Sequence, residues 1–93
     1  MTDPLAPLRA RFLERVQADL EILRRPSADP VETARLVHRL AGSAGIFGFS
    51  EVSRLAAIVD DEFHAGGAPS EPALADLVAA LEALPPAGTG TLA

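Results

Sequence analysis

The sequence predicts an all-α protein that folds as an antiparallel up-down-up-down four-helix bundle. Four segments carry apolar residues at spacings of three and four, which is the period of a helix with one buried side. No segment of useful length shows the alternation of apolar and polar residues that is typical of a strand. The connections between the helical segments are short, so an antiparallel arrangement buries all four apolar stripes. We expect a single domain over residues 1–86, followed by a disordered tail over residues 87–93.

The first two predicted helices have clear limits. Pro4 and Pro7 fit the entry to the first helix, and Pro26 stops it. The second helix is expected to have Asp29 as its cap and Pro30 in its first position, with a glutamate completing a capping-box pattern, and to run to Ile46 or Phe47. The apolar stripe of the first helix comprises Leu5, Leu8, Phe12, Val16, Leu20 and Leu23.

The last two predicted helices are marked by glycine, serine and proline. Gly48 suits the left-handed residue that ends the second helix, and Ser50 is expected to cap the third. Gly66 follows the third helix, Ser70 precedes the fourth, and Pro85 closes it. The two stripes comprise Val52, Leu55, Ala56, Val59 and Phe63 in the third helix, and Leu74, Leu77, Val78, Leu81 and Leu84 in the fourth.

Composition excludes several classes of protein. The chain has no cysteine, so it has neither disulfides nor thiolate metal sites, and its net charge of −5 argues against general nucleic-acid binding. The start lacks the pattern of a signal peptide and no stretch is long enough to cross a membrane, so we expect a cytoplasmic protein that does not bind membranes. All eight basic residues are arginine.

One histidine, His38, is expected to stand on a side of the second helix that carries mostly small residues. On a helical wheel, Leu36, Leu40 and Phe47 fall opposite His38 and are expected to face the core. Glycine in a helix interior costs about 1 kcal/mol relative to alanine, which is reasonable if something large approaches the histidine. The residues within about 60° of His38 on the wheel are Val31, Ala34, Arg35, Ala41, Gly42 and Gly45.

An exposed imidazole of this kind suits nucleophilic chemistry with phosphate. Histidine forms covalent phosphoryl intermediates when one ring nitrogen is oriented by a hydrogen bond and positive charge lies nearby. Arg35 and Arg39 lie to one side of His38 on the wheel and are candidates for that charge, while Asp60 in the third helix is a candidate to orient the ring. The competing interpretation is that the alanines and glycines pack against another helix, that the arginines are a solvated flank, and that the histidine has no special role.

Other functions are less well supported. A histidine kinase is excluded because the sequence holds no ATP-binding domain or glycine-rich phosphate loop. The dimerisation region of a kinase would be a two-helix hairpin. Asp60 and His64 stand at positions i and i+4, but such pairs are common on exposed helices, so we assign no metal site and interpret His64 as a favourable cation near a helix end.

Residues 38–48, with the sequence HRLAGSAGIFG, resemble the motif of the histidine-containing phosphotransfer (HPt) domain family. The motif is a histidine followed by x-x-Lys-Gly-Ser/Ala, further small residues, and a glycine ten positions after the histidine. His38, Gly42, Ser43, Ala44 and Gly48 match it, and the resemblance covers residues 30–67 well. The flanking segments match only as helices.

The resemblance implies that His38 carries a phosphoryl group on its imidazole in a two-component phosphorelay. Its partners would be the aspartates of response-regulator receiver domains, with a hybrid histidine kinase as a further candidate, and the protein would act as a monomer. It would need no cofactor of its own, since the Mg²⁺ belongs to the receiver. Gly42 would leave room for the phosphoryl group and the docking receiver, and Gly45 belongs to the same small-residue surroundings. Ala41 departs from the family pattern because it stands where the motif has lysine. Arg35 or Arg39 would replace that charge, since arginine binds phosphate at least as well as lysine. If neither does, transfer would be slow or would depend on charge supplied by the partner. The alternative function is a helical interaction module that binds a receiver or another signalling protein without phosphotransfer.

Overall fold

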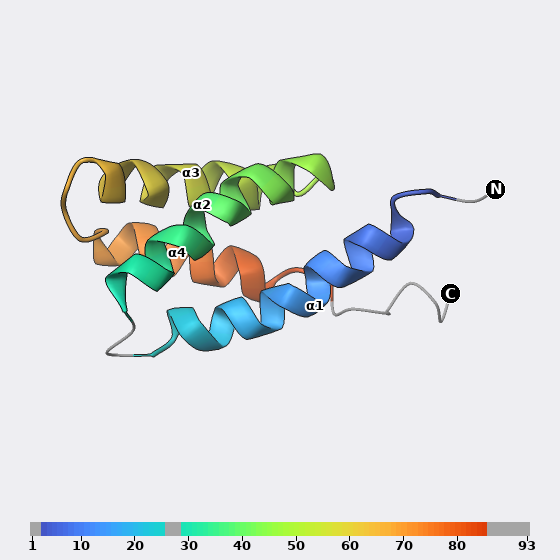
Figure 1. Ribbon diagram of the computed structural model, residues 1–93, viewed down its shortest axis with the longest axis horizontal. Coiled ribbons are helices and arrows are strands. Elements are labelled where there is room, and N and C mark those ends of the chain that lie inside the picture. The colour runs from blue at the N-terminus through green and yellow to red at the C-terminus, as the bar shows by residue number, and fades with distance from the viewer. Residues whose placement is uncertain (1–2, 26–28, 86–93) are drawn as a thin grey trace.

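The protein is an all-α bundle of four helices in the computed structural model, which describes residues 3–25 and 29–85. The helices are α1 (Ala6–Leu23), α2 (Pro30–Ile46), α3 (Ser50–His64) and α4 (Glu71–Glu82). Successive helices run in opposite directions, as Figure 1 shows. α2 packs on α3, α3 on α4, α4 on α1 and α1 on α2, so the predicted bundle is confirmed. The tail expected over residues 87–93 lies outside the described residues.

The predicted starts of α2 and α4 are confirmed. The carboxylate of Asp29 accepts a hydrogen bond from the backbone N–H of Val31 at 3.0 Å, and a proline occupies the first turn. The hydroxyl of Ser70 accepts a longer bond, 3.4 Å, from the N–H of Ala73 at the start of α4. These side chains satisfy backbone donors that a helix leaves unpaired at its N-terminus.

The prediction that Ser50 caps α3 is wrong. Ser50 is already the first helical residue, and Phe49 precedes it without a side-chain hydrogen bond to the helix. The reason is the left-handed backbone of Gly48, with φ of 86°, which turns the chain so that the N–H of Phe49 donates to the carbonyl of Ala44 at 2.9 Å. Phe49 then stacks on Phe12 of α1, with ring centroids 5.6 Å apart. The α2–α3 turn is therefore fixed by a glycine and an aromatic contact.

The core is built from leucine, valine and phenylalanine side chains of all four helices. Leu36 and Leu40 are buried on the side of α2 that the wheel placed opposite His38, and Phe47 is partly buried against the same core. The assignment of the two sides of α2 is therefore confirmed. The buried apolar residues are Phe12, Leu13, Val16, Leu20, Leu23, Leu36, Val37, Leu40, Ala44, Val52, Ala56, Val59, Leu77 and Leu81.

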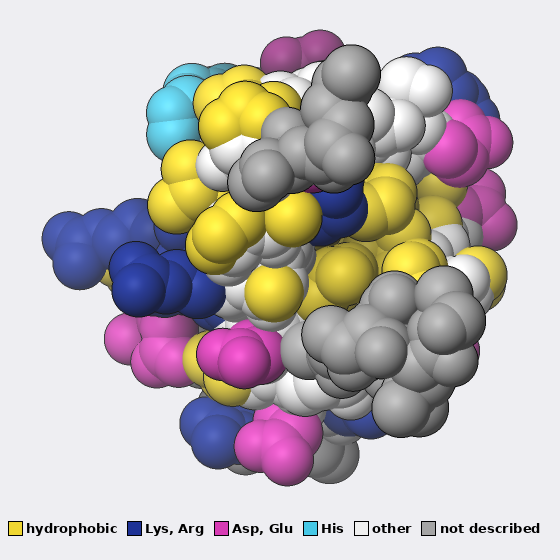
Figure 2. All heavy atoms as spheres, turned by 90° about the vertical axis from the view of Figure 1, so that its right-hand side faces the viewer, with side chains coloured by type: hydrophobic (Ala, Val, Ile, Leu, Met, Phe, Trp, Pro, Cys, Tyr) yellow, Lys and Arg dark blue, Asp and Glu magenta, His cyan; other side chains and the backbone are white. Residues whose placement is uncertain are grey.

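Apolar side chains are exposed at the end of the bundle that holds the α2–α3 turn. Figure 2 shows hydrophobic side chains exposed there, and histidine and arginine side chains on one flank of the molecule. Leu5, Leu8 and Ile46 are among the exposed large hydrophobic residues. In the part of the chain that the structure describes, no helix is long and apolar enough to cross a membrane.

Candidate functional site

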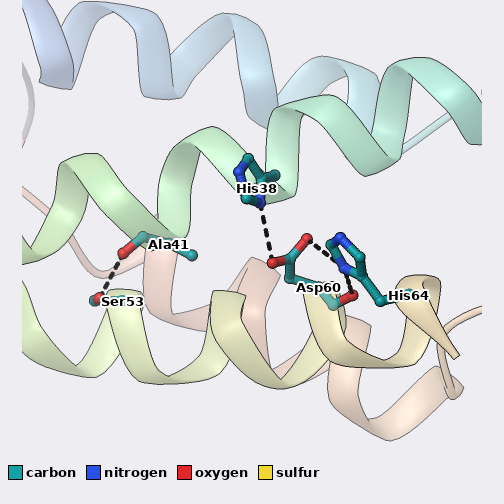
Figure 3. A network of polar contacts seen from close by, with 5 residues as sticks. All are labelled: His38, Ala41, Ser53, Asp60 and His64. Carbon is teal, nitrogen blue, oxygen red and sulfur yellow. Dashed lines mark hydrogen bonds and ion pairs between the residues drawn. The ribbon is translucent and has the colours of Figure 1, made fainter.

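His38 stands on the exposed side of α2, near the middle of the helix. Its side chain is 73% exposed, while Leu40 two residues later is 1% exposed. The imidazole points toward α3, as Figure 3 shows. A large molecule can therefore approach the ring without any change in the core.

Asp60 of α3 lies directly beside the ring. His38 Nδ1 and Asp60 Oδ2 are 3.1 Å apart, and the Asp60 side chain is only 15% exposed. Because a carboxylate accepts hydrogen bonds, the contact places the proton on Nδ1 and leaves the lone pair on Nε2. The structure thus brings together the histidine and the orienting carboxylate proposed from sequence.

His64 lies on the other side of the same carboxylate. Its Nδ1 is 3.4 Å from Asp60 Oδ1 and donates a hydrogen bond to the backbone carbonyl of Asp60 at 2.8 Å. The bond to a carbonyl in the last turn agrees with its interpretation as a group that suits a helix C-terminus. The centroids of the His38 and His64 rings are 6.0 Å apart, and the carboxylate of Asp60 contacts both imidazoles (Figure 3).

The small residues around His38 divide into two groups. Gly42 is exposed, and a Cβ built on it would meet no atom within 4 Å, so the space above it is open. A Cβ on Gly45 would lie 3.3 Å from the hydroxyl of Ser53, which itself donates to the carbonyl of Ala41 at 2.7 Å. Gly45 therefore allows α3 to approach α2 closely, as the packing interpretation proposed, whereas the surface at Gly42 is open.

Arg39 is engaged by α1 and not by the histidine. Its Nη2 donates to Asp19 Oδ1 at 2.7 Å, and Asp19 is 4% exposed. A buried carboxylate needs such a partner, because an unpaired charge in the interior is strongly destabilising. Sequence reasoning missed this pair. The available signal was that Asp19 falls three residues after Val16, on the apolar stripe of the first helix.

Arg35 is the remaining arginine near the site. It is exposed, and it lines a shallow surface pocket of about 380 Å³ together with His38, Asp60 and His64. Among residues 3–25 and 29–85, no carboxylate forms an ion pair with it. Its guanidinium is therefore available to a phosphate group bound in this pocket.

Comparison with protein families agrees with the fold. The profile of the Hpt domain matches residues 7–86, which is most of the chain. The protein therefore belongs to the Hpt domain family, whose members are phosphotransfer-type signalling modules. No curated protein and no solved structure shows significant similarity to the chain.

Proposed function

We propose that the protein carries a phosphoryl group on Nε2 of His38 and exchanges it with the aspartates of response-regulator receiver domains. The observation that carries this proposal is the exposed imidazole whose Nδ1 lies 3.1 Å from Oδ2 of Asp60, a side chain that is only 15% exposed. That contact favours the tautomer with a free lone pair on Nε2, which is the nitrogen able to attack phosphorus.

The transfer step needs only groups described above and a phosphorylated receiver. The Nε2 lone pair forms the N–P bond, the bond between phosphorus and the receiver carboxylate oxygen breaks, and its electron pair stays on that carboxylate. The positive charge that develops on the ring is stabilised by Asp60 through the Nδ1 proton, which later passes to solvent. Asp60 is thus a positioning residue with an electrostatic contribution, and His38 is the nucleophile.

Detection of phosphohistidine tests the proposal. The protein is incubated with a panel of phosphorylated receiver domains, and the label is followed by its acid lability and by mass spectrometry of the peptide containing His38. Transfer of label to His38 is the expected result. The alternative, an interaction module without phosphotransfer, predicts a receiver that binds while no label reaches the protein.

Gly42→Gln should block transfer without weakening the bundle. Glutamine is a better helix former than glycine, and the open space above Gly42 offers no clash inside the protein. The new side chain would instead occupy the space beside the imidazole that a receiver needs. The expected pair of results is a melting temperature unchanged or raised, and label transfer largely lost.

A matched control for Gly42→Gln is Ala79→Gln, an exposed site on α4, the helix that packs on α3 and α1. Ala79→Gln should transfer label at the normal rate. Normal transfer by the Gly42 variant would show that this surface of α2 does not dock the partner.

Arg35→Gln should slow transfer. Hydrogen bonds to a charged group are worth roughly 1.5–3 kcal/mol when well formed and less at an exposed site, so we expect an effect of about tenfold. Ala41→Lys, which introduces the lysine of the family motif, should partly restore the rate. The measurement is the rate at which a phosphorylated receiver loses label at fixed ionic strength.

Arg39 is left unchanged in this experiment because its loss would leave the buried carboxylate of Asp19 without an ion-pair partner. Arg54→Gln is the control, since Arg54 is exposed and pairs with Glu51 at 2.7 Å. If Arg35→Gln and Arg54→Gln both transfer at the normal rate, the charge that holds the phosphoryl group must come from the partner.

A further inference from the structure

His38, Asp60 and His64 form a cluster with the dimensions of a metal site. A ligand atom from each residue lies within 4.8 Å of the other two, and the closest approaches are 3.1 Å and 3.4 Å. In tetrahedral zinc sites, ligand atoms lie roughly 2.0–2.2 Å from the metal and therefore about 3.3–3.6 Å from one another. The cluster needs only small side-chain movements to reach that geometry.

The framework around the cluster favours such movements. Asp60 and His64 are one turn apart on α3, and the hydrogen bond from Ser53 to the carbonyl of Ala41 holds α2 close to α3. Both imidazoles are exposed, so they can turn without disturbing the core. Arg35 and Arg39 line the same pocket and would repel a metal ion, but Arg39 is paired with Asp19 and the whole chain carries a net charge of −5.

The donor set indicates which ion would bind. Two imidazole nitrogens and one carboxylate oxygen are ligands of Zn²⁺ in sites that leave a fourth position to water. Mg²⁺ and Ca²⁺ prefer all-oxygen sites, so they match this cluster poorly. The side of the cluster away from the helices is open to solvent, where a water molecule can complete the coordination.

We propose that His38, Asp60 and His64 bind Zn²⁺ and that the bound ion prevents His38 from accepting a phosphoryl group. Coordination through Nδ1 uses the lone pair of that nitrogen, so the proton of the neutral ring moves to Nε2. Nε2 then has no lone pair for attack on phosphorus. The same tautomer change at His64 replaces its hydrogen bond to the Asp60 carbonyl with a bond to the metal.

The binding half of this proposal is independent of the phosphotransfer function, and the inhibitory half rests on it. Binding is measured by titrating zinc chloride against the protein in competition with a fluorescent chelator, and by the chemical shifts of the imidazole nitrogens in NMR spectra. We expect Nδ1 of both rings to shift. His64→Gln should weaken binding by about tenfold or more, since even changes outside the ligand set cost 10–100-fold.

The matched control is Asp61→Asn, which removes the neighbouring exposed carboxylate from the same helix but is not part of the cluster. It should bind zinc with nearly unchanged affinity. Circular dichroism confirms that each variant is folded. Equal affinities of His64→Gln and wild type, or zinc-induced shifts confined to carboxylates elsewhere, would overturn the proposed site.

Inhibition is measured as the ratio of transfer rates with and without zinc, using the same phosphorylated receiver for each variant. We expect zinc to slow transfer to the wild-type protein and to Asp61→Asn, to have a much smaller effect on His64→Gln, and to be reversed by a chelator. Equal slowing of all three proteins would place the effect on the receiver and overturn the inhibitory half. Absence of transfer without zinc would instead refute the phosphotransfer function, while the binding result would stand.

Discussion

Replacing His38 with glutamine should abolish phosphorylation while leaving the fold intact. Glutamine has no nitrogen able to attack phosphorus, but its amide can still donate a hydrogen bond to Asp60. The imidazole is 73% exposed, so its loss should change the free energy of unfolding by only a few tenths of a kcal/mol, as at most surface sites. The measurement is the label on the protein after exposure to a phosphorylated receiver.

The variant must also be shown to be folded. Its helical circular dichroism and its urea midpoint should match those of the wild type, so that loss of label reports on chemistry alone. Acid-labile label that persists in the His38 variant would mean that another residue, such as His64, accepts the phosphoryl group. The site would then have to be reassigned.

Leu40→Ala should destabilise the bundle by about 2–5 kcal/mol, the range found when a buried leucine is truncated and a cavity remains. Leu40 is 1% exposed and is one of the largest fully buried side chains. A domain of this size is stable by only about 5–15 kcal/mol, so the loss is a large part of the total. The chain has no tryptophan or tyrosine, and urea unfolding is therefore best followed by circular dichroism.

Ile46→Ala is the control for Leu40→Ala. Ile46 also lies on α2 but is 68% exposed, so its truncation should change the free energy of unfolding by no more than about 0.5 kcal/mol. A small loss at Leu40 together with a large loss at Ile46 would show that the buried and exposed sides of α2 have been exchanged.

The parts of the fold that depend on nearest neighbours in the chain could be predicted from the sequence. Asp29 followed by a proline marks the start of α2, because a short polar side chain caps a helix and proline needs no backbone partner there. The helical period alone predicts which side of α2 faces the core, because Leu36 and Leu40 are four residues apart and lie on the same side of the helix. Ser50 was mispredicted because the turn is fixed by an aromatic contact with α1, which no local pattern records.

The parts of the site that depend on contacts between helices were only partly predictable. Asp60 was a reasonable partner for His38 because it lies near the edge of the apolar stripe of α3, but its distance from the ring required the packing of α2 on α3. Arg39 and Arg35 look alike on a wheel, yet only Arg39 meets the buried Asp19. The cluster of His38, Asp60 and His64 could not be predicted either. Helical spacing brings His64 close to Asp60, but it does not show that His38, 26 residues before His64, lies beside them.

The tight turn at Gly48 gives the site a low contact order. His38 and Asp60 are 22 residues apart and belong to two helices joined directly by that turn, so only a short loop has to close before they meet. α1 extends past the bundle, where Leu8 and Leu5, the residue before the helix, are exposed, and it contributes no side chain to the His38 cluster. We therefore expect the helical hairpin α2–α3 to hold the imidazole in place even when the first turn of α1 frays.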